Sequence, residues 1–146
     1  KTLNKILFCG RVVKEKGVET AINALKFIHR TQHTVTLDII GFISAQYQAE
    51  LNQLIDELGL CDHIRFLGQS DDLSQIYPNY DVLFMPTQTR EPFGLVLIEA
   101  MHYGLICFAS DRYGPRNIIQ HEHSGILIDS DKPESWASAF NNYCHQ

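Results

Sequence analysis

The sequence predicts an α/β fold in which one doubly wound, mainly parallel sheet has six strands. Short β-rich runs alternate along the chain with segments of helical periodicity, which is typical of parallel strands joined by crossover helices. The chain has 146 residues, the length of one ordinary domain, and 45% of them are hydrophobic, enough to build a core. The run at 81–87 is almost wholly apolar, as expected for a central strand covered on both faces.

The first half of the chain supplies three predicted strands and two predicted helices. The strands cover residues 5–12, 35–41 and 63–68. Residues 17–29 carry apolar side chains at i, i+3, i+4 and i+7, the pattern of a helix with one face packed on a core. Residues 45–58 repeat this pattern, and Gly59 follows as a glycine that ends the helix.

The second half continues the alternation. The predicted strands cover residues 81–87, 105–110 and 125–129, and the predicted helical segments are 73–77, one begun by Pro92, 116–121, and 133–144. Pro133 suits the first turn of the last helix, where a backbone N–H is not needed. Without an internal repeat or linker, residues 1–146 are predicted to form one Rossmann-like domain, whose ligands bind at the carboxyl ends of the strands.

Charge and composition exclude several classes of partner. The net charge is −5 and the sequence has no block of Lys and Arg, so neither nucleic acid nor anionic lipid is expected to bind. No apolar run reaches the roughly 18 residues that span a bilayer. We therefore expect no membrane span, and peripheral membrane contact at most.

The cysteines favour a reducing, cytoplasmic setting. The four cysteines lie far apart and form neither a CxxC pair nor a Cys/His pair at the spacing of metal ligands. Cys9 and Cys107 fall inside apolar strand-like runs, where a free thiol packs as a small hydrophobe.

The stretch EPFGLVLIEA, residues 91–100, predicts an anion site at the start of a helix. Pro92 fits the first helical turn, which leaves Glu91 in the preceding loop. Phe93, Gly94 and Leu95 then present backbone N–H groups without helical partners, and such groups bind phosphate. The alternative is that Glu91 only favours the positive end of the helix dipole.

Glu99 is the only charged residue between positions 93 and 109. Burial of an unpaired carboxylate is costly, so Glu99 is expected to have a partner. That partner is either a cation of this domain or the diol of a bound sugar, and an exposed helix edge is a third interpretation.

The stretch FCGRVVKEKG, residues 8–17, predicts a second part of the same site. Gly10 ends the first strand and leaves room for a ligand, while Arg11 and Lys16 project from the following loop. An arginine fork and a mobile lysine together suit a diphosphate. In the alternative interpretation the loop is a solvated turn, which we expect for Lys14 and Glu15 in either case.

Together, GR-x4-KG and E-P-F-G-L-x3-E-A-M-x2-G-L resemble the C-terminal, nucleotide-sugar-binding domain of the retaining glycosyltransferases of family 4, also called glycosyl transferases group 1. The resemblance covers essentially the whole chain. It implies one half of a GT-B enzyme, which consists of two Rossmann domains.

The resemblance also implies roles for individual residues. Arg11 and Lys16 match the basic pair that neutralises the diphosphate, and Glu91 matches the glutamate beside the transferred sugar, so these three are the candidate catalytic residues. Glu99 matches the glutamate that binds the ribose hydroxyls. Gly10 belongs to the same nucleotide-sugar site, as do the residues whose amides meet the phosphates and sugar: Phe93, Gly94, Leu95 and Val96.

The resemblance further implies a reaction and its partners. A sugar is transferred with retained anomeric configuration from a nucleotide sugar, such as a UDP- or GDP-sugar, to a glycan or lipid-linked acceptor. No metal or other cofactor is expected. An N-terminal acceptor-binding domain is the missing partner, and the full-length protein is expected in the cytoplasm, or at the inner face of the membrane, in polysaccharide biosynthesis.

The chain departs from the family pattern after the fifth strand. Tyr113 replaces a glycine, and Asn117 stands where a glutamate is expected. None of the seven histidines is placed by its motif as a substitute for a base from the other domain.

Two other classes of α/β domain have a similar composition: a noncatalytic binding module, which the sequence leaves open, and a receiver, which lacks its expected residues here. A noncatalytic α/β nucleotide- or ligand-binding module would have Glu99 paired internally and a solvated Arg11 loop. A response-regulator-like receiver needs an acidic cluster after the first strand and an aspartate after the third, where Arg11 and Gly68 stand instead.

Overall fold

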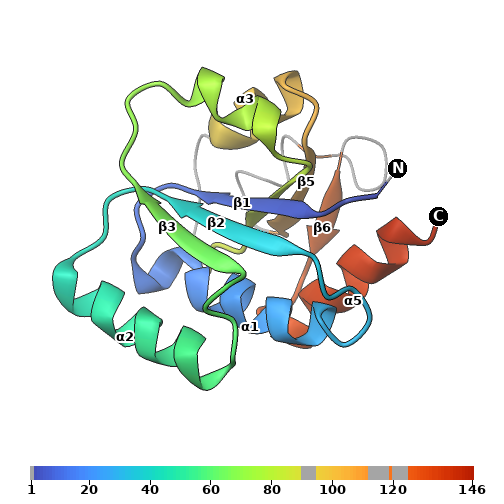
Figure 1. Ribbon diagram of the computed structural model, residues 1–146. Helices are drawn as coiled ribbons and strands as arrows, with labels where there is room; N and C mark the ends of the chain where they lie inside the picture. The colour runs from blue at the N-terminus through green and yellow to red at the C-terminus, as the bar shows by residue number, and fades with distance from the viewer. Residues whose placement is uncertain (1, 90–94, 112–118, 120–124) are drawn as a thin grey trace.

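The computed structural model describes residues 2–89, 95–111, 119 and 125–146 (Figure 1). Within them, six strands form one sheet in the order β3-β2-β1-β4-β5-β6, and every neighbouring pair is parallel. The strands are β1 (Lys5–Cys9), β2 (Thr36–Ile40), β3 (Ile64–Gly68), β4 (Val82–Met85), β5 (Ile106–Ser110) and β6 (Ile126–Ile128). The predicted α/β, Rossmann-like class is confirmed.

The helices cover both faces of this sheet (Figure 1). On one face lie α1 (Val18–Ile28), α2 (Ala45–Glu57) and α5 (Pro133–Cys144). On the other face lie α3 (Leu95–His102) and two 3-10 turns, Leu73–Gln75 and Tyr77–Asn79. A third 3-10 turn, Lys14–Lys16, connects β1 to α1.

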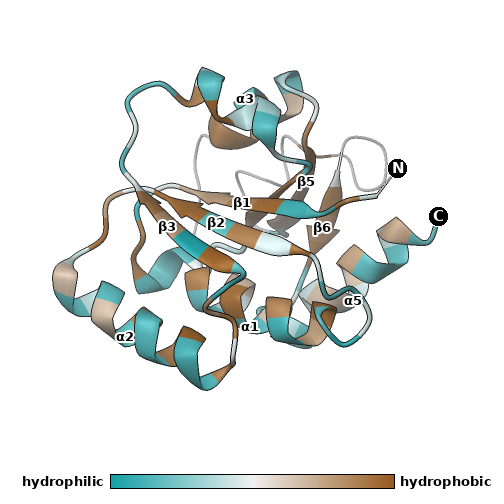
Figure 2. Cartoon of the chain, in the orientation of Figure 1, coloured by the Kyte–Doolittle hydropathy of each residue, from teal (hydrophilic) through white to brown (hydrophobic). Residues whose placement is uncertain are grey.

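The alternation of side chains along each strand builds two cores, one on each face of the sheet. In β1, Ile6 and Phe8 join the core under α1, α2 and α5, whereas Leu7 joins the core under α3. Phe84 and Trp136 meet in the first core with ring centroids 5.2 Å apart. Figure 2 shows the result: strands are largely hydrophobic, and the hydrophilic side of α2 faces outward.

Several predicted boundaries change at glycine and proline. The first strand ends at Cys9 instead of residue 12, because Gly10 has φ of 139°, a conformation that side-chain-bearing residues rarely adopt. The fourth strand ends at Met85, before Pro86. The helical segment predicted at 73–77 is two 3-10 turns, and Pro78 lies inside the second. The segment predicted at 116–121 falls, apart from Ile119, outside the described residues.

Candidate functional site

A pocket of about 240 Å³ opens at the carboxyl ends of β1 and β4. Its lining includes four of the predicted site residues, Gly10, Arg11, Lys16 and Val96, together with Phe8, Cys9, Phe84, Met85 and Thr87. The chain runs outward from β1 to β3 and then returns to β4 on the other side of β1. Connections therefore leave β1 and β4 in opposite directions, which is where doubly wound sheets form their binding crevice.

The loop that carries Lys16 is held against the end of β4 by a glycine. Gly17 adopts a left-handed conformation with φ of 79° and precedes the first residue of α1. A Cβ atom at this position would lie 1.8 Å from the Pro86 carbonyl oxygen, so only glycine fits. The Gln88 amide donates a hydrogen bond of 2.8 Å to the Glu15 carbonyl. The β1–α1 and β4–α3 connections are thereby fastened together.

A second close backbone approach shapes the Gly10 side of the pocket. A Cβ atom on Gly41 would lie 1.7 Å from the Gly10 carbonyl oxygen, and the Gly10 amide donates to the Ile40 carbonyl over 3.0 Å. A Cβ atom on Gly10, in contrast, would meet nothing within 4 Å. The sequence-based expectation that Gly10 leaves open space is confirmed.

The two predicted cations reach the same pocket from one loop. Arg11 is exposed and Lys16 is half-buried, and both line the cavity. In a chain with a net charge of −5, this places two positive side chains where the backbone is closely packed. Such a pair can bind an anion with several oxygens, because arginine donates in a fixed fork and lysine as a point charge.

Thr87 and Cys9 also line this pocket, and no motif in the sequence singled them out. Thr87 is fully buried, and its hydroxyl donates 3.1 Å to the Thr89 carbonyl. Burial raises the pKa of the Cys9 thiol to about 11; the charge of Glu99 adds to this, and a hydrogen bond with Tyr77 opposes it. Cys9 is therefore a neutral wall residue at physiological pH. The sequence signal that could have identified Cys9 and Thr87 is their position at the carboxyl ends of two adjacent central strands, β1 and β4.

Glu99 lies on α3, one turn after Val96, and is solvent-exposed. Of the interpretations that the sequence left open, the exposed helix edge is the one found, because only part of the apolar run faces the sheet: Leu97 is buried, whereas Ile98 is 49% exposed. The expectation of a partner is confirmed in a form that the sequence did not predict. The Tyr77 hydroxyl donates a hydrogen bond of 3.2 Å to Glu99 Oε1.

Several predicted residues lie outside the pocket or outside the described residues. Among the described residues, Leu95 and Glu99 do not line this pocket, and the Leu95 side chain is 65% exposed. The remaining predicted positions lie outside the described residues: Glu91, Phe93, Gly94, Tyr113 and Asn117. Their roles stay predictions.

A larger pocket, about 530 Å³, lies between the β1–α1 connection and α2. Its walls are mostly apolar and include Val12, Phe42, Tyr47 and Leu51. The only basic side chain described in its lining is Lys14, beside the carboxylates of Glu19 and Glu50. It contains none of the predicted site residues, so we place the candidate site in the smaller pocket.

The described part of the chain forms neither a candidate metal centre nor a membrane-spanning helix. In residues 2–89, 95–111, 119 and 125–146, no three or more His, Cys, Asp or Glu side chains form a group able to hold a metal ion. The expected independence from metals stays a prediction. None of the described helices is long and apolar enough to cross a bilayer.

Comparisons with known proteins place this geometry in a family. The family described as glycosyl transferases group 1 matches residues 1–146. An uncharacterized glycosyltransferase of Methanocaldococcus jannaschii is 37% identical over 135 residues, which cover 90% of this chain and 33% of that protein. The chain thus spans about a third of the length of this curated relative.

Solved structures agree with this match. Anabaena HepE, in a complex with UDP-glucose, has a TM-score of 0.86 at 29% identity, over 95% of this chain and 38% of HepE. The C-terminal domain of a glycosyl transferase group 1 protein (LpcC) of Francisella tularensis shares the fold, with a TM-score of 0.85 at 24% identity over 98% of this chain and 76% of that domain. From the family match along its whole length, the chain belongs to the glycosyl transferases group 1 family.

Proposed function

We propose that this chain is the nucleotide-sugar-binding, C-terminal half of a retaining, family 4 glycosyltransferase with the GT-B architecture. The observation that carries the proposal is the meeting of Arg11 and Lys16 with Gly10 and Val96 in one pocket at the centre of the sheet. Family membership and the likeness to HepE, solved with UDP-glucose, support the same assignment.

In this proposal the pocket binds the diphosphate of a UDP- or GDP-sugar. Arg11 and Lys16 neutralise its negative charge, and this charge grows on the leaving phosphate as the sugar departs. Cations that are already in position stabilise that charge without a large reorganisation of solvent. In the same scheme, the backbone amides of residues 93–96 add N–H donors to the phosphates and the sugar.

The two glutamates have different proposed tasks. Glu91, which its motif matches to the glutamate beside the transferred sugar, is proposed to favour the positive character that develops there. Glu99, within α3, accepts hydrogen bonds from the ribose hydroxyls. No metal takes part in this scheme, since Arg11 and Lys16 supply the positive charge.

The complete reaction requires more protein than these residues. We propose that an N-terminal domain supplies the acceptor site, that the acceptor is a glycan or lipid-linked sugar of a polysaccharide pathway, and that the residues described here transfer little sugar alone. We further propose a cytoplasmic location, with peripheral contact at the inner membrane. The four cysteines, all among the described residues and all free thiols, favour such a reducing compartment.

Titration calorimetry of this chain against UDP, GDP, UDP-glucose and GDP-mannose tests the proposal. We expect one nucleotide series to bind, and Arg11→Ala to weaken that binding roughly tenfold or more, since it removes a charge-assisted contact. Lys14→Ala is the matched control, because Lys14 is a cation of the same loop that lines the other pocket.

The noncatalytic binding module remains the second candidate, and the same titration separates it. A folded chain that gives no heat with any of these four compounds would contradict the proposal. Equal losses of nucleotide affinity in Arg11→Ala and Lys14→Ala would show that binding depends on the overall charge of the loop and not on a specific site.

A further inference from the structure

We propose that Tyr77 is a positioning residue, which holds the Glu99 carboxylate in place for the ribose of the bound nucleotide. This inference rests on the proposed function, in which Glu99 accepts from ribose hydroxyls. It assigns a task to a side chain that lies outside both sequence motifs and that is 22 positions from Glu99.

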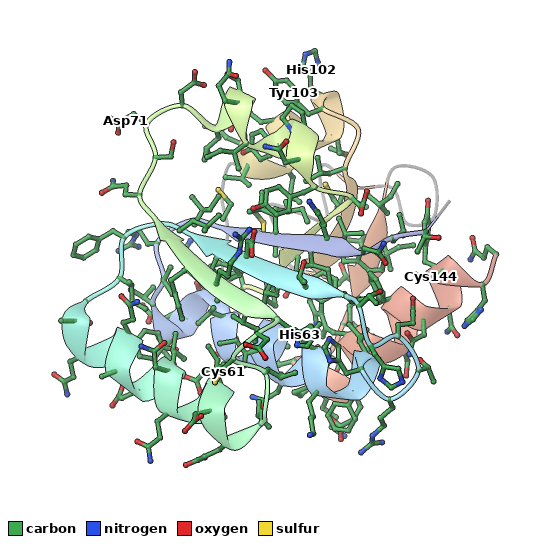
Figure 3. All side chains as sticks on the ribbon, in the orientation of Figure 1. Cys61, His63, Asp71, His102, Tyr103 and Cys144 are labelled. Atoms are coloured by element: carbon green, nitrogen blue, oxygen red, sulfur yellow. The ribbon has the colours of Figure 1, made fainter. Side chains whose placement is uncertain are left out.

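The hydrogen bond joins a buried side chain to an exposed one. The Tyr77 side chain is held in the core under α3 with 1% of its surface exposed, and its ring stacks on that of Tyr103 with centroids 5.6 Å apart. Glu99 is exposed on α3, and Tyr103 is the residue that directly follows the last residue of this helix, His102 (Figure 3 labels Tyr103 and His102). An exposed glutamate samples several rotamers, and a hydrogen bond from a fixed hydroxyl restricts them.

Tyr77 also relates Glu99, which lies outside the pocket, to the β1 side of that pocket. Its hydroxyl donates to Glu99, and Cys9 packs against the same core cluster that contains Tyr77. Cys9 immediately precedes Gly10 and Arg11 and lines the pocket with them. Tyr77 therefore belongs to a core that reaches the end of β1, where the proposed diphosphate site begins, and it donates to Glu99 on α3, where the proposed ribose site lies.

The chemistry of this cluster keeps Tyr77 a hydrogen-bond donor throughout the physiological range. Burial, followed by the neighbouring Cys9 and Glu99, raises the pKa of the Tyr77 phenol. Burial also raises the pKa of the nearby Cys107 thiol to about 12. The phenol stays protonated, and its one proton is available to the carboxylate, whose remaining lone pairs can accept from a ligand.

The test uses Tyr77→Phe, which keeps the buried ring and removes only the hydroxyl. We expect this variant to weaken UDP binding roughly three- to tenfold, the effect of one lost hydrogen bond, in calorimetric titrations. Binding of 2′,3′-dideoxy-UDP is expected to stay unchanged, because that nucleotide has no hydroxyl for Glu99. In a Glu99→Ala background, which has no side-chain acceptor for Tyr77, Tyr77→Phe is expected to have no further effect on UDP binding.

The control is Tyr80→Phe. The Tyr80 hydroxyl donates to Asp38 Oδ2 over 2.5 Å, so this variant also removes a tyrosine–carboxylate hydrogen bond beside the same core, but one that does not involve Glu99. UDP affinity is expected to be unchanged in it. An equal loss for UDP and 2′,3′-dideoxy-UDP in Tyr77→Phe, or no loss for either, would overturn the inference.

A crystal structure of Tyr77→Phe separates this inference from the proposed function. We expect the Glu99 carboxylate to leave the position that it occupies in the wild-type chain. A Glu99 side chain that stays in place would overturn the positioning role even if UDP binds. Failure of the wild-type chain to bind UDP and GDP would overturn the ribose assignment together with the proposed function. If only GDP binds, the same comparison uses GDP and 2′,3′-dideoxy-GDP.

Discussion

Gly17 lies so close to Pro86 that no side chain fits between them: a Cβ atom on Gly17 would be 1.8 Å from the Pro86 carbonyl oxygen. This contact presses the loop that carries Lys16 against the end of β4. It is a backbone contact between residues 69 positions apart, and it sets the width of the candidate site on one side.

Gly17→Ala is therefore expected to destabilise the fold. The left-handed backbone costs about 1–2 kcal/mol for alanine, and relief of the clash adds about 1–3 kcal/mol. Gly59→Ala is the control, because Gly59 has a similar φ of 70° but open space around the added carbon. Urea denaturation measures both. An equal loss in the free energy of unfolding in the two variants would show that the Gly17–Pro86 contact does not contribute to the effect.

Binding of a nucleoside diphosphate is expected to depend on salt through Arg11. Two cations at one pocket attract an anion by a force that added ions screen. Raising NaCl from about 0.05 M to about 0.5 M should weaken UDP or GDP binding several-fold in calorimetry. The salt dependence should be smaller in Arg11→Ala and unchanged in Lys14→Ala. A wild-type affinity that does not vary with salt contradicts the proposed electrostatic role.

His29 is expected to make the fold less stable in mild acid. Burial lowers the pKa of its imidazole; a hydrogen bond with the Val35 carbonyl, at 2.7 Å, opposes this, and nearby His63, His33 and Lys26 lower the pKa further. The unfolded chain then binds more protons than the folded chain near the ordinary histidine pKa of about 6.5. The stabilisation is present above that pH and is lost as the pH falls through it.

Urea denaturation midpoints at about pH 7.5 and about pH 5.5 check this sign. His29→Gln, which can still donate to the Val35 carbonyl, should reduce the fall in stability between the two values. His145→Gln changes an exposed histidine near the C-terminus and serves as the control. A fall of the same size in wild type and His29→Gln would assign the pH dependence to other groups.

Alkylation of Cys9 offers a test of the pocket that requires no enzyme activity. Cys9 lines the candidate site, and burial raises its pKa to about 11, so its thiol should react slowly with iodoacetamide. Bound UDP or GDP should slow the reaction further. Cys61 is exposed and lies on the far side of the sheet from Tyr103 and α3, so nucleotide should not alter its rate (Figure 3). Mass spectrometry distinguishes the two sites, and protection of both cysteines, or of neither, contradicts the assignment.

Local patterns predicted most of the fold. The last helix was expected over residues 133–144 and is Pro133–Cys144, because a proline start and an amphipathic stripe are properties of adjacent residues. The strands were found in every expected place for the same reason. The observed strand ends differ from the predicted ones where the conformation of a single residue ends the strand. Gly10 is an example: it has φ of 139°, and its carbonyl lies against Gly41, the residue that follows β2.

The juxtaposition of Arg11, Lys16 and Val96 was also predictable, since the carboxyl ends of parallel strands share one edge. The width of that site was not, because it depends on the contacts of Gly17 with Pro86 and of Gly41 with Gly10. Such contacts between distant segments leave no periodic pattern in the chain.

Glu99 shows most clearly what the sequence determines and what only the tertiary structure decides. The amino-acid sequence revealed a lone carboxylate in an apolar helix and the need for a partner. Only the packing of α3 on the sheet decided that the carboxylate faces solvent and that Tyr77 supplies the hydrogen bond. Periodicity specifies which face of a helix is apolar, but the depth of burial and the identity of a distant partner depend on where the folded chain brings that face.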